Sequence, residues 1–473
     1  MFASSLGQDE NLTVTLDAKK VIVMKIKLSD SFTYGKLVRF VLPSIIMMIF
    51  TSIYSLVDGF FVSNFTGKTD FAALNIVFPL LMIVGGIGFM TGTGGSALVA
   101  KTLGEGEKEK ANAYFSLVVY FTLAVGLGAS ALGVIFIRPL SKLLGATDNM
   151  MRGCVVYGTI MLCAMPAFML QNTFQAFFVA AEKPRAGLIV TIIAGVTNII
   201  GDAVLVGIFR FGLAGAAAAS ALGQIAGGVV PVIYFGRKNS SLLRLGRTSL
   251  FWKAIGKTVT NGSSELLGSI SSSVVNMLYN ARLMRIVGED GVSAYGVMMY
   301  VGFVFAAIFI GYSMGSAPII SYNYGAKNQK ELKSVFNKSM FMLSLSGVIM
   351  TALAVGLADA FSGIFTGYDQ TLRDTTRHGL RLYALHFLVC GINIYGSSFF
   401  TALNNGVVSA ILSFMRALVF QTSAVILLPL VIKPAIDGVW ISVAVAEAAA
   451  FVLTVSLIVA NGKKYGYAGK FPA

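Results

Sequence analysis

Long apolar stretches separated by short polar connections run from residue 38 to residue 461 of the chain. Each has about 20 residues or more, which is the length an α-helix needs to cross a hydrocarbon core of roughly 30 Å. Membrane-barrel strands would be about 10 residues long and alternating, and backbone in lipid must satisfy its own hydrogen bonds, so the pattern predicts helices. We count twelve spans, at 38–62, 72–99, 113–137, 153–180, 186–209, 212–235, 259–281, 294–321, 336–361, 379–402, 407–432 and 437–461.

Composition supports an all-α integral membrane protein. The 473 residues are 56% hydrophobic and 12% charged, with a mean hydropathy of +0.78. Soluble proteins carry roughly 25% charged residues. The longest connection, at 236–258, is a basic stretch too short for a soluble domain, so the function must reside among the helices.

The basic residues predict the orientation of the chain in the membrane. The net charge is +15, and Lys and Arg gather before residue 36 and in alternate connections such as 101–110, 237–257 and 327–338. This is the positive-inside pattern, and it predicts a multi-pass protein of the cell (inner) membrane with both termini in the cytoplasm. Nucleic acid is a poor partner because no compact basic domain exists to bind it.

The N-terminal region lacks the order of segments that marks a cleavable signal peptide. Its apolar patch "VIVMKIKL" is too short to span, and Met24 opens an ordinary lead-in to the first span, so residues 1–23 are predicted to be dispensable. The three cysteines, Cys154, Cys163 and Cys390, lie in or beside apolar spans without metal or disulfide spacing and are interpreted as packing residues.

An internal repeat divides the chain into two halves. At an offset of 221 residues, Gly67, Ala73, Ile87, Gly94 and Gly104 coincide with Gly288, Ala294, Ile308, Gly315 and Gly325. "FFVAAEKP" from Phe177 lies over "FFTALNNG" from Phe399 at an offset of 222. The repeat predicts two pseudo-symmetric six-helix bundles around a central cavity. The predicted segments are a cytoplasmic N-terminal segment at 1–35, bundles at 36–235 and 259–461, a cytoplasmic linker at 236–258 and a cytoplasmic tail at 462–473.

Parallel halves of this kind are typical of transporters that open a central site alternately to either side. A channel would be expected to show a pore motif such as a carbonyl-lined re-entrant loop, and the sequence shows none. An enzyme is also disfavoured. His378 and His386 are the only histidines, and they have neither zinc spacing nor a Ser-His-Asp order.

Several motifs together resemble the multidrug and toxic compound extrusion (MATE) family. They are "LPSIIMMIFTSIYSLVDGFFVSNFTG" (42–67), "GTGGSALVAKTLGEGEKEKA" (92–111) and "TNIIGDAVLVGIFRFGLAGAAAASALGQ" (197–224), with the linker between the halves. The resemblance implies an antiporter, monomeric as is usual in the family, that exports amphipathic, often cationic drugs and dyes across the lipid bilayer. It needs no cofactor, and its coupling ion would be H⁺ or Na⁺. Flippases of lipid-linked saccharides belong to the same superfamily and are the alternative.

The resemblance also implies a coupling site in the N-terminal half. Its bacterial members with an Asp in the first span and Asn-x-x-x-Asp in the fifth match Asp58 and "NIIGD" here. Asp58, Asn198 and Asp202, with Ser220 on the sixth span, would then form the cation or proton site, and the first three would bind Na⁺ if the protein is Na⁺-coupled. The chain has Ala203 where such relatives often have Pro, so a kink there is not assumed.

The residues themselves favour the same positions. The acids within the spans are Asp58, Asp202, Glu265 and Glu447, and a charge near the bilayer centre costs roughly 2.5 to 3.5 kcal/mol. Asn198 and Asp202 are four residues apart and share a helix face. The alternative for both aspartates is a structural role in capping or pairing helices. Glu265 and Glu447 are additional candidates for coupling or substrate binding, with a helix-end or helix-packing role as the alternative.

Other residue types suggest where substrate would bind. The repeat places Phe420, Ala424 and Val425 opposite Asn198 and Asp202, so the C-terminal half lacks that acid pair, and Arg416 falls within the eleventh span. A flippase would be expected to present several cations, whereas the candidate groups in the spans are acids. An adaptable pocket for flat cations is predicted from aromatic, amide and Met side chains, with helix packing as the alternative. These side chains are Met47, Tyr54, Gln175, Tyr279, Met298 and Tyr300.

Overall fold

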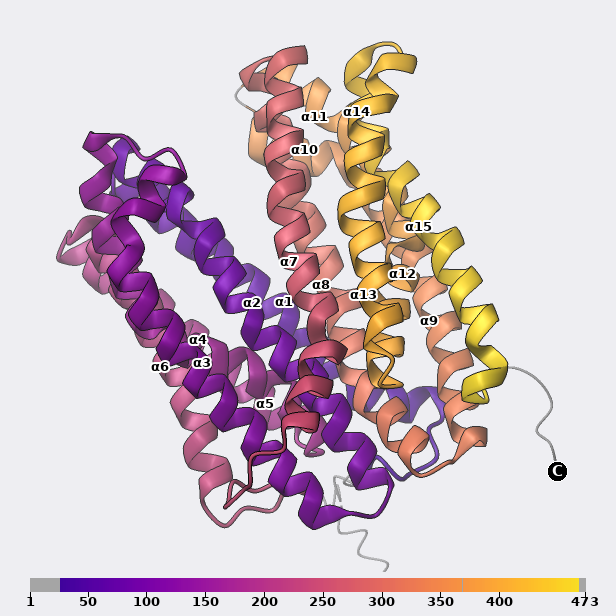
Figure 1. Cartoon of the computed structure of the whole chain (residues 1–473). Coiled ribbons are helices and arrows are strands. Elements are labelled where there is room, and N and C mark those ends of the chain that lie inside the picture. The colour runs from indigo at the N-terminus through magenta and orange to yellow at the C-terminus, as the bar shows by residue number, and fades with distance from the viewer. Residues whose placement is uncertain (1–25, 368, 468–473) are drawn as a thin grey trace, which may run out of the picture.

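The computed structural model describes residues 26–367 and 369–467 as two helical bundles that follow one another along the chain (Figure 1). The helices of the first bundle cross the molecule one after another. They are α1 (Tyr34–Phe65), α2 (Lys68–Gly104), α3 (Lys108–Leu143), α4 (Asp148–Ala180), α5 (Pro184–Gly201) with the π-helical segment η1 (Asp202–Ile208), and α6 (Gly212–Gly236).

The second bundle has the same plan with more interruptions. Its helices are α7 (Trp252–Ile286), α8 (Glu289–Gly325), α9 (Gln329–Gly356), α10 (Ala358–Thr366), α11 (Gln370–Tyr383), the 3₁₀ turn η2 (Ala384–His386), α12 (Phe387–Ala402), α13 (Gly406–Phe414), the π-helical segment η3 (Met415–Phe420), α14 (Gln421–Val431) and α15 (Ala435–Tyr465). The tenth span is α11, η2 and α12 together, and the eleventh is α13, η3 and α14. The short α10 precedes the tenth span.

The twelve predicted spans therefore correspond to twelve helical crossings in the fold. Within the described residues, eleven helical segments are long and apolar enough to cross a membrane. The remaining crossing is α7, which has 35 residues but a more polar sequence. Its polar face is used inside the protein: Asn261 bonds Asn404, and the Ser264 carbonyl accepts a hydrogen bond from Ser413.

The two bundles meet at one end and spread apart toward the other (Figure 1). Where they meet, α1 packs on α8 and α2 packs on both α7 and α8. Glycines allow these crossings because their Cα atoms lie against the facing backbone. A Cβ at Gly104 would collide with Tyr322, and a Cβ at its repeat equivalent Gly325 would collide with Lys101. Small residues at such crossings let membrane helices approach closely.

Backbone geometry confirms the internal repeat. Left-handed φ values occur at Gly67 (87°) and Gly288 (85°), which start α2 and α8. They also occur at Glu182 (58°) and Asn404 (58°), which lie 222 residues apart in the turns after α4 and α12. A non-glycine residue with positive φ is uncommon, so two at matching positions indicate that both halves use the same turn.

A short segment before α1, residues 26–33, connects the two bundles at the end where they meet. The Leu28 amide donates to Glu182 Oε1 (2.8 Å) in the first bundle, and the Phe32 amide donates to Glu331 Oε1 (2.8 Å) in the second. Both Leu28 and Phe32 are buried in the core formed with α8, α9 and α12. The segment therefore belongs to the folded structure, whereas residues 1–23, predicted to be dispensable, lie outside the described residues.

An ion pair outside the apolar spans orders the same segment. Asp30 accepts a hydrogen bond from the Lys27 amide (3.0 Å) and pairs with Lys36 (2.9 Å). Burial alone would raise the pKa of Asp30, but these two donors outweigh it and hold the pKa below its ordinary value. At pH values above the ordinary pKa of Asp, this contact contributes its full stabilisation to the fold. That contribution is lost as the pH falls through the lowered pKa of Asp30.

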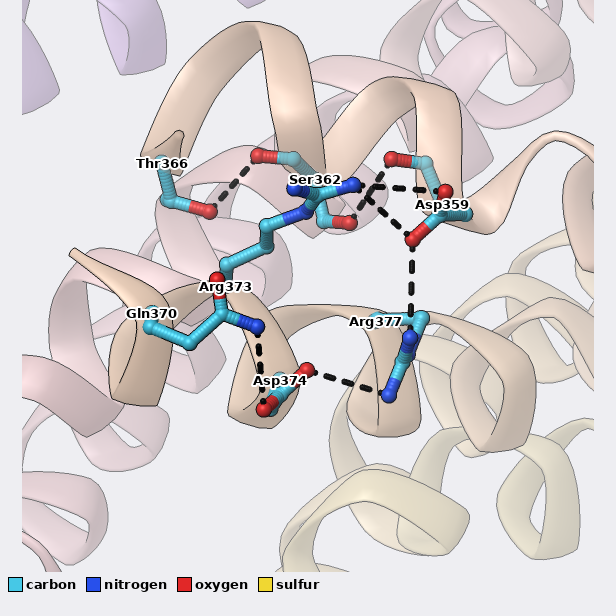
Figure 2. Close-up of polar contacts among 7 residues, drawn as sticks. All are labelled: Asp359, Ser362, Thr366, Gln370, Arg373, Asp374 and Arg377. Atoms are coloured by element: carbon cyan, nitrogen blue, oxygen red, sulfur yellow. Dashed lines mark hydrogen bonds and ion pairs between the residues drawn. The ribbon is translucent and has the colours of Figure 1, made fainter. Parts of the chain in front are cut away.

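A cluster of ion pairs joins α10 to α11 at the end where the bundles diverge (Figure 2). Arg373 and Arg377 both reach Asp359, and Arg377 also pairs with Asp374 at 3.0 Å. These side chains are one third to one half exposed. Pairs this exposed typically contribute about 0 to 1 kcal/mol each, so the cluster orients two surface helices and does not carry the fold.

Phe32→Ala should destabilise the protein strongly. Loss of a fully buried Phe typically costs about 3 to 5 kcal/mol, and Phe32 is 1% exposed. Thermal unfolding in detergent should show a clearly lower Tm. The matched control is Phe303→Ala on α8, where the side chain is 52% exposed and the cost should stay near 0.5 kcal/mol. Equal shifts for both variants would show that residues 26–33 are not part of the core.

Candidate functional site

Three helices of the first bundle bring polar side chains into direct contact. Ser220 on α6 donates to Asp58 Oδ1 on α1 (3.0 Å), and Asn198 on α5 donates to the same oxygen (3.4 Å). The Asn198 amide nitrogen also reaches Ser220 Oγ (3.2 Å). Asn198 is 3% exposed. Three side chains far apart in sequence thus form one hydrogen-bonded group with a carboxylate at its centre.

Asp202 lies beside this group and is completely buried. Neither of its carboxylate oxygens has a hydrogen-bond partner among the described residues. The Asp58 carboxylate is close enough to interact with it electrostatically. A buried carboxylate without a donor is costly, so a proton or a cation is expected to neutralise it.

Asp202 begins the π-helical segment η1, where the fifth span departs from α-helical geometry. The Phe209 amide bonds the Val204 carbonyl, five residues back, at 2.9 Å. Single-turn π segments are frequent at functional sites because they redirect side chains. The sequence has Ala203 and not Pro after Asp202, so no proline kink was predicted here. The structure shows a π-helical turn at this position instead.

Glycines set the spacing of the three helices around the site. A Cβ at Gly201 would lie 2.8 Å from Ala219 Cβ, and a Cβ at Gly223 would lie 2.8 Å from the Ala194 carbonyl oxygen. A Cβ at Gly195 would lie 2.5 Å from Phe50 and 2.9 Å from Tyr54. The absence of side chains at these three positions lets α1 and α6 approach α5 closely enough for their polar groups to meet.

The site offers oxygen atoms that have no donor among the described residues. Besides the Asp202 carboxylate, Asn198 Oδ1 and Gln224 Oε1 are buried and unpaired. Gln224 lies four residues after Ser220 and therefore on the same face of α6. Carboxylate and amide oxygens suit hard cations, and two neighbouring carboxylates can also share a proton. The predicted residues Asp58, Asn198, Asp202 and Ser220 are thus brought together, and their role in coupling remains a prediction.

Glu447 is engaged in a salt bridge inside the second bundle. Arg416 Nε contacts its two carboxylate oxygens at 2.8 and 3.1 Å, and Asn393 Nδ2 donates to Glu447 Oε2 at 2.7 Å. Glu447 is 1% exposed, and its partner neutralises it. The interpretation that the candidate groups in the spans are all acids is therefore incomplete, because Arg416 in η3 is a cation within the eleventh span.

Glu265 on α7 has a different environment. It is partly exposed, and no hydrogen bond or ion pair of its carboxylate occurs among the described residues. It interacts electrostatically with Arg416. Of the two additional acids predicted from the sequence, Glu447 is therefore paired, whereas Glu265 remains available to a ligand.

The predicted substrate-pocket residues lie in separate regions. Met47 packs with Met48, Ala307 and Met314 at the contact of α1 with α8, and Gln175 lies inside the first bundle. Tyr279 and Met298 share the core of the second bundle, where Tyr279 bonds Ser442 at 2.7 Å. Tyr54 packs over Gly195 near the site, and Tyr300 is 45% exposed beside Phe365. Residue type alone does not distinguish core positions from surface ones. In this structure the six side chains do not line one common space.

Sequence reasoning missed some of the polar groups that the fold brings together. Gln224 and Asn393 were not among the residues predicted for a site. The available signal was the rarity of charged side chains in apolar spans: an Arg and two Glu in the spans of the same half favour pairing of the Arg with one of the acids. Within the described residues, no group of three or more His, Cys, Asp and Glu could hold a metal ion.

Comparisons with known proteins show which family and which relatives this chain is similar to. The MatE family model matches twice, at residues 43–204 and 266–427, so the two matches lie one in each half. The multidrug export protein MepA of Staphylococcus aureus (strain NCTC 8325 / PS 47) is 23% identical over 387 residues, covering 81% of this chain and 84% of MepA. MepA of Staphylococcus haemolyticus (strain JCSC1435) is 23% identical over 328 residues, covering 69% and 72%.

Solved structures share the fold at low sequence identity. A crystal structure of MATE in complex with MaL6 aligns with a TM-score of 0.86 at 20% identity, covering 92% of this chain and 98% of that one. A multidrug resistance MATE transporter of the MOP superfamily, described as outward-facing, aligns with a TM-score of 0.85 at 20% identity and the same coverage.

Gly223→Val should separate α6 from α5 and disturb the hydrogen-bonded group. The added Cβ would lie 3.0 Å from Asn198 Cβ, and overpacking of this kind costs about 1 to 3 kcal/mol. Thermal unfolding in detergent should show a lower Tm. Gly128→Val on α3 is the matched control, since nothing lies within 4 Å of its added Cβ. An unchanged Tm for Gly223→Val would mean that this close approach is not required.

Proposed function

This chain belongs to the MatE family of membrane transporters, the MATE family, and we propose from that membership that it exports amphipathic, often cationic compounds in exchange for H⁺ or Na⁺. As a family member it is a multi-pass membrane transporter and not an enzyme. The name of the MepA relatives supports drugs as the substrate class. The substrates and the coupling ion are the proposed part.

The observation that carries the proposal is the buried Asp202 carboxylate beside Asp58. Among the described residues Asp202 has no donor, while Asp58 accepts from Ser220 and Asn198. The pair holds two negative charges in a site that has donors for only one of them. Repulsion and burial both oppose this state, so binding of one cation or proton relieves the imbalance. A site of this kind changes its energy each time the ion binds or leaves.

Coupling follows from that change in energy. When the ion is bound, the three helices α1, α5 and α6 are held together around a neutralised centre. When it leaves, the two carboxylates repel, and nothing lies within 4 Å of the Cβ position of Gly59, the residue after Asp58 on α1. We propose that α1 shifts at Gly59 as Asp58 gains or loses its ion and that this shift links the site to the crossing of α1 with α8.

The oxygen atoms at the site can bind either ion. Na⁺ would contact hard oxygens, and the unpaired Asn198 Oδ1 and Asp202 carboxylate supply them. Gln224 Oε1, also unpaired among the described residues and one helical turn along α6 from Ser220, is proposed as a further ligand. A proton would be shared between Asp58 and Asp202. The two choices differ in one respect that can be measured: only Na⁺ requires the amide oxygens, so Gln224→Leu should impair a Na⁺-driven exchanger more than a proton-driven one.

The arrangement of the bundles supports alternating access. They meet at the end that carries residues 26–33 and the connection between α6 and α7, and they diverge at the other end (Figure 1). We propose that the closed end faces the cytoplasm of the cell's inner membrane, in agreement with the basic residues at that end, and that the protein works as a monomer. In that orientation the bundles diverge toward the outside (Figure 1).

A lipid-linked saccharide flippase is less well supported. Such a substrate carries a diphosphate and would require free cations in the transport path. Arg416 lies within the eleventh span, but its charge is already neutralised by Glu447. The site with unpaired charge, at Asp58 and Asp202, is negative and therefore favours cations.

Asp58→Asn and Asp202→Asn should each abolish ion-coupled transport while preserving expression. The reason is that an amide can neither release a proton nor attract a cation as a carboxylate does. Uptake of a fluorescent cationic dye into inverted vesicles is measured with a proton gradient, with a Na⁺ gradient and with neither. Wild-type uptake should depend on one of the two gradients, and each variant should lose at least about tenfold, or roughly 1.4 kcal/mol of coupling.

Asp148→Asn in the exposed first turn of α4 is the matched control and should transport normally. Full activity in both site variants would contradict the proposed role of the two aspartates. Gradient-independent uptake by the wild type would contradict antiport itself.

A further inference from the structure

The connection between α6 and α7 carries positive charge without any acid. Residues 236–258 contain six Lys or Arg and no Asp or Glu. In the adjacent connection from α2 to α3, Glu105 and Glu107 already pair with Lys101 and Lys110. Five of the six bases are exposed and form no ion pair among the described residues. They are Arg237, Lys238, Arg244, Arg247 and Lys253.

The connection is fixed on the first turns of α3. The Arg244 amide donates to Asn112 Oδ1 (2.7 Å). The Gly246 amide donates to Ser116 Oγ (3.0 Å). Leu243, just before these contacts, is completely buried in the core of the first bundle. The bases of this segment are therefore held in place on one side of the fold.

The connection crosses α3 where the apolar surface of that helix begins. Tyr120 is exposed, and its hydroxyl donates to the Gly246 carbonyl (3.2 Å). The large exposed apolar side chains that follow on α3 are Leu123, Leu127, Leu132, Ile135 and Phe136. Tyr and Trp are enriched where membrane helices leave the hydrocarbon region. The connection therefore lies at the level where lipid headgroups begin.

Three consecutive large apolar residues are exposed beside the bases. They are Leu250, Phe251 and Trp252, and Trp252 is 70% exposed. The Phe251 ring contacts that of Tyr114 on α3, with 5.5 Å between their centroids. The apolar group thus lies over the same turns of α3 as Arg244 and its neighbours. Exposed apolar groups of this kind, next to polar ones, mark a surface that meets a membrane or a partner.

We propose that the surface formed by residues 237–253 binds anionic phospholipids, with the bases on the lipid phosphates and Trp252 in the interfacial layer. Clusters of about four to eight Lys or Arg beside a membrane helix attract anionic headgroups. A lipid leaflet offers an anionic layer directly above an apolar one, which matches both halves of this surface. Since the connection is bonded to α3 and continues into α7, bound lipid holds both bundles at this level. Such binding needs only a membrane and is independent of the proposed export function.

The experiment uses Trp252 as a probe of the lipid around it. The full chain is reconstituted in vesicles of phosphatidylcholine with a minor fraction of phosphatidylglycerol. Bromine, which quenches tryptophan on contact, is placed on the acyl chains of one lipid or the other. Trp440, the only other tryptophan, is 1% exposed in the core of the second bundle. The difference between the wild type and Trp252→Phe therefore reports Trp252.

The wild type should favour phosphatidylglycerol over phosphatidylcholine at Trp252 by about fivefold or more, the effect of at least one base near the membrane surface. R244Q/R247Q/K253Q should bring this preference close to one. Trp252 should still be quenched by either lipid in that variant, because the apolar group is kept. The three bases are exposed, so the variant should fold normally, which an unchanged Tm in detergent checks.

The matched control removes three exposed bases from the opposite end of the same bundle. R138Q/K142Q/R152Q changes the end of α3 and the start of α4 and should leave the preference at Trp252 unchanged. The charge reversal R244E/R247E/K253E should turn the preference toward phosphatidylcholine. Salt at about 1 M should weaken the wild-type preference, because it shortens the range of electrostatic attraction to about 3 Å.

Three results would overturn the anionic-lipid surface. The first is a wild-type preference close to one, and the second is a preference that persists in R244Q/R247Q/K253Q. The third is Trp252 fluorescence that neither brominated lipid quenches, since the apolar group would then lie away from the bilayer. None of these results bears on export, which dye uptake measures separately.

Discussion

The proposed transport mechanism depends on the balance between negative charge and hydrogen-bond donors around Asp58 and Asp202. Two carboxylates share the interior of one bundle, and the described side chains supply donors to only one of them. In a soluble protein, water would make up the difference. Within an apolar bundle, an unpaired carboxylate is costly, and we propose that a proton or a cation neutralises it.

Close packing through glycine connects that site to the shape of the whole molecule. Gly195, Gly201 and Gly223 bring α1 and α6 onto α5, and the repeat-related Gly104 and Gly325 bring the bundles together at one end. Helices this close transmit a shift of one to its neighbours, because a packed contact has few intermediate arrangements. In the proposed mechanism, a change at Asp58 would reach the crossing of α1 with α8 along a single continuous helix, Tyr34–Phe65.

Much of the fold was predictable because apolar length and internal repetition are read directly from sequence. The repeat is confirmed by the double family match and by the matched left-handed turns at Glu182 and Asn404. The contact of Asp58 with Asn198 and Ser220 followed from a family resemblance and not from spacing, since their positions are far apart in the chain. The Arg416 to Glu447 pair and the π-helical turn at Asp202 were not predicted, because long-range pairing and local helix distortion leave no periodic pattern. The residues predicted for a substrate pocket lie in separate regions, because aromatic and Met side chains also pack in cores, and their role in binding stays a prediction.

The most direct test of the central claim is the ion displaced when substrate binds to purified protein. A cationic dye is added to the protein in weakly buffered detergent solution, and proton release is followed with a pH indicator, with and without Na⁺, together with displacement of radioactive Na⁺. We predict that dye binding displaces one of these ions from the wild-type protein. The displacement should disappear in the D58N/D202N double variant. Undiminished displacement in that variant, or no displacement of either ion from the wild type, would contradict it.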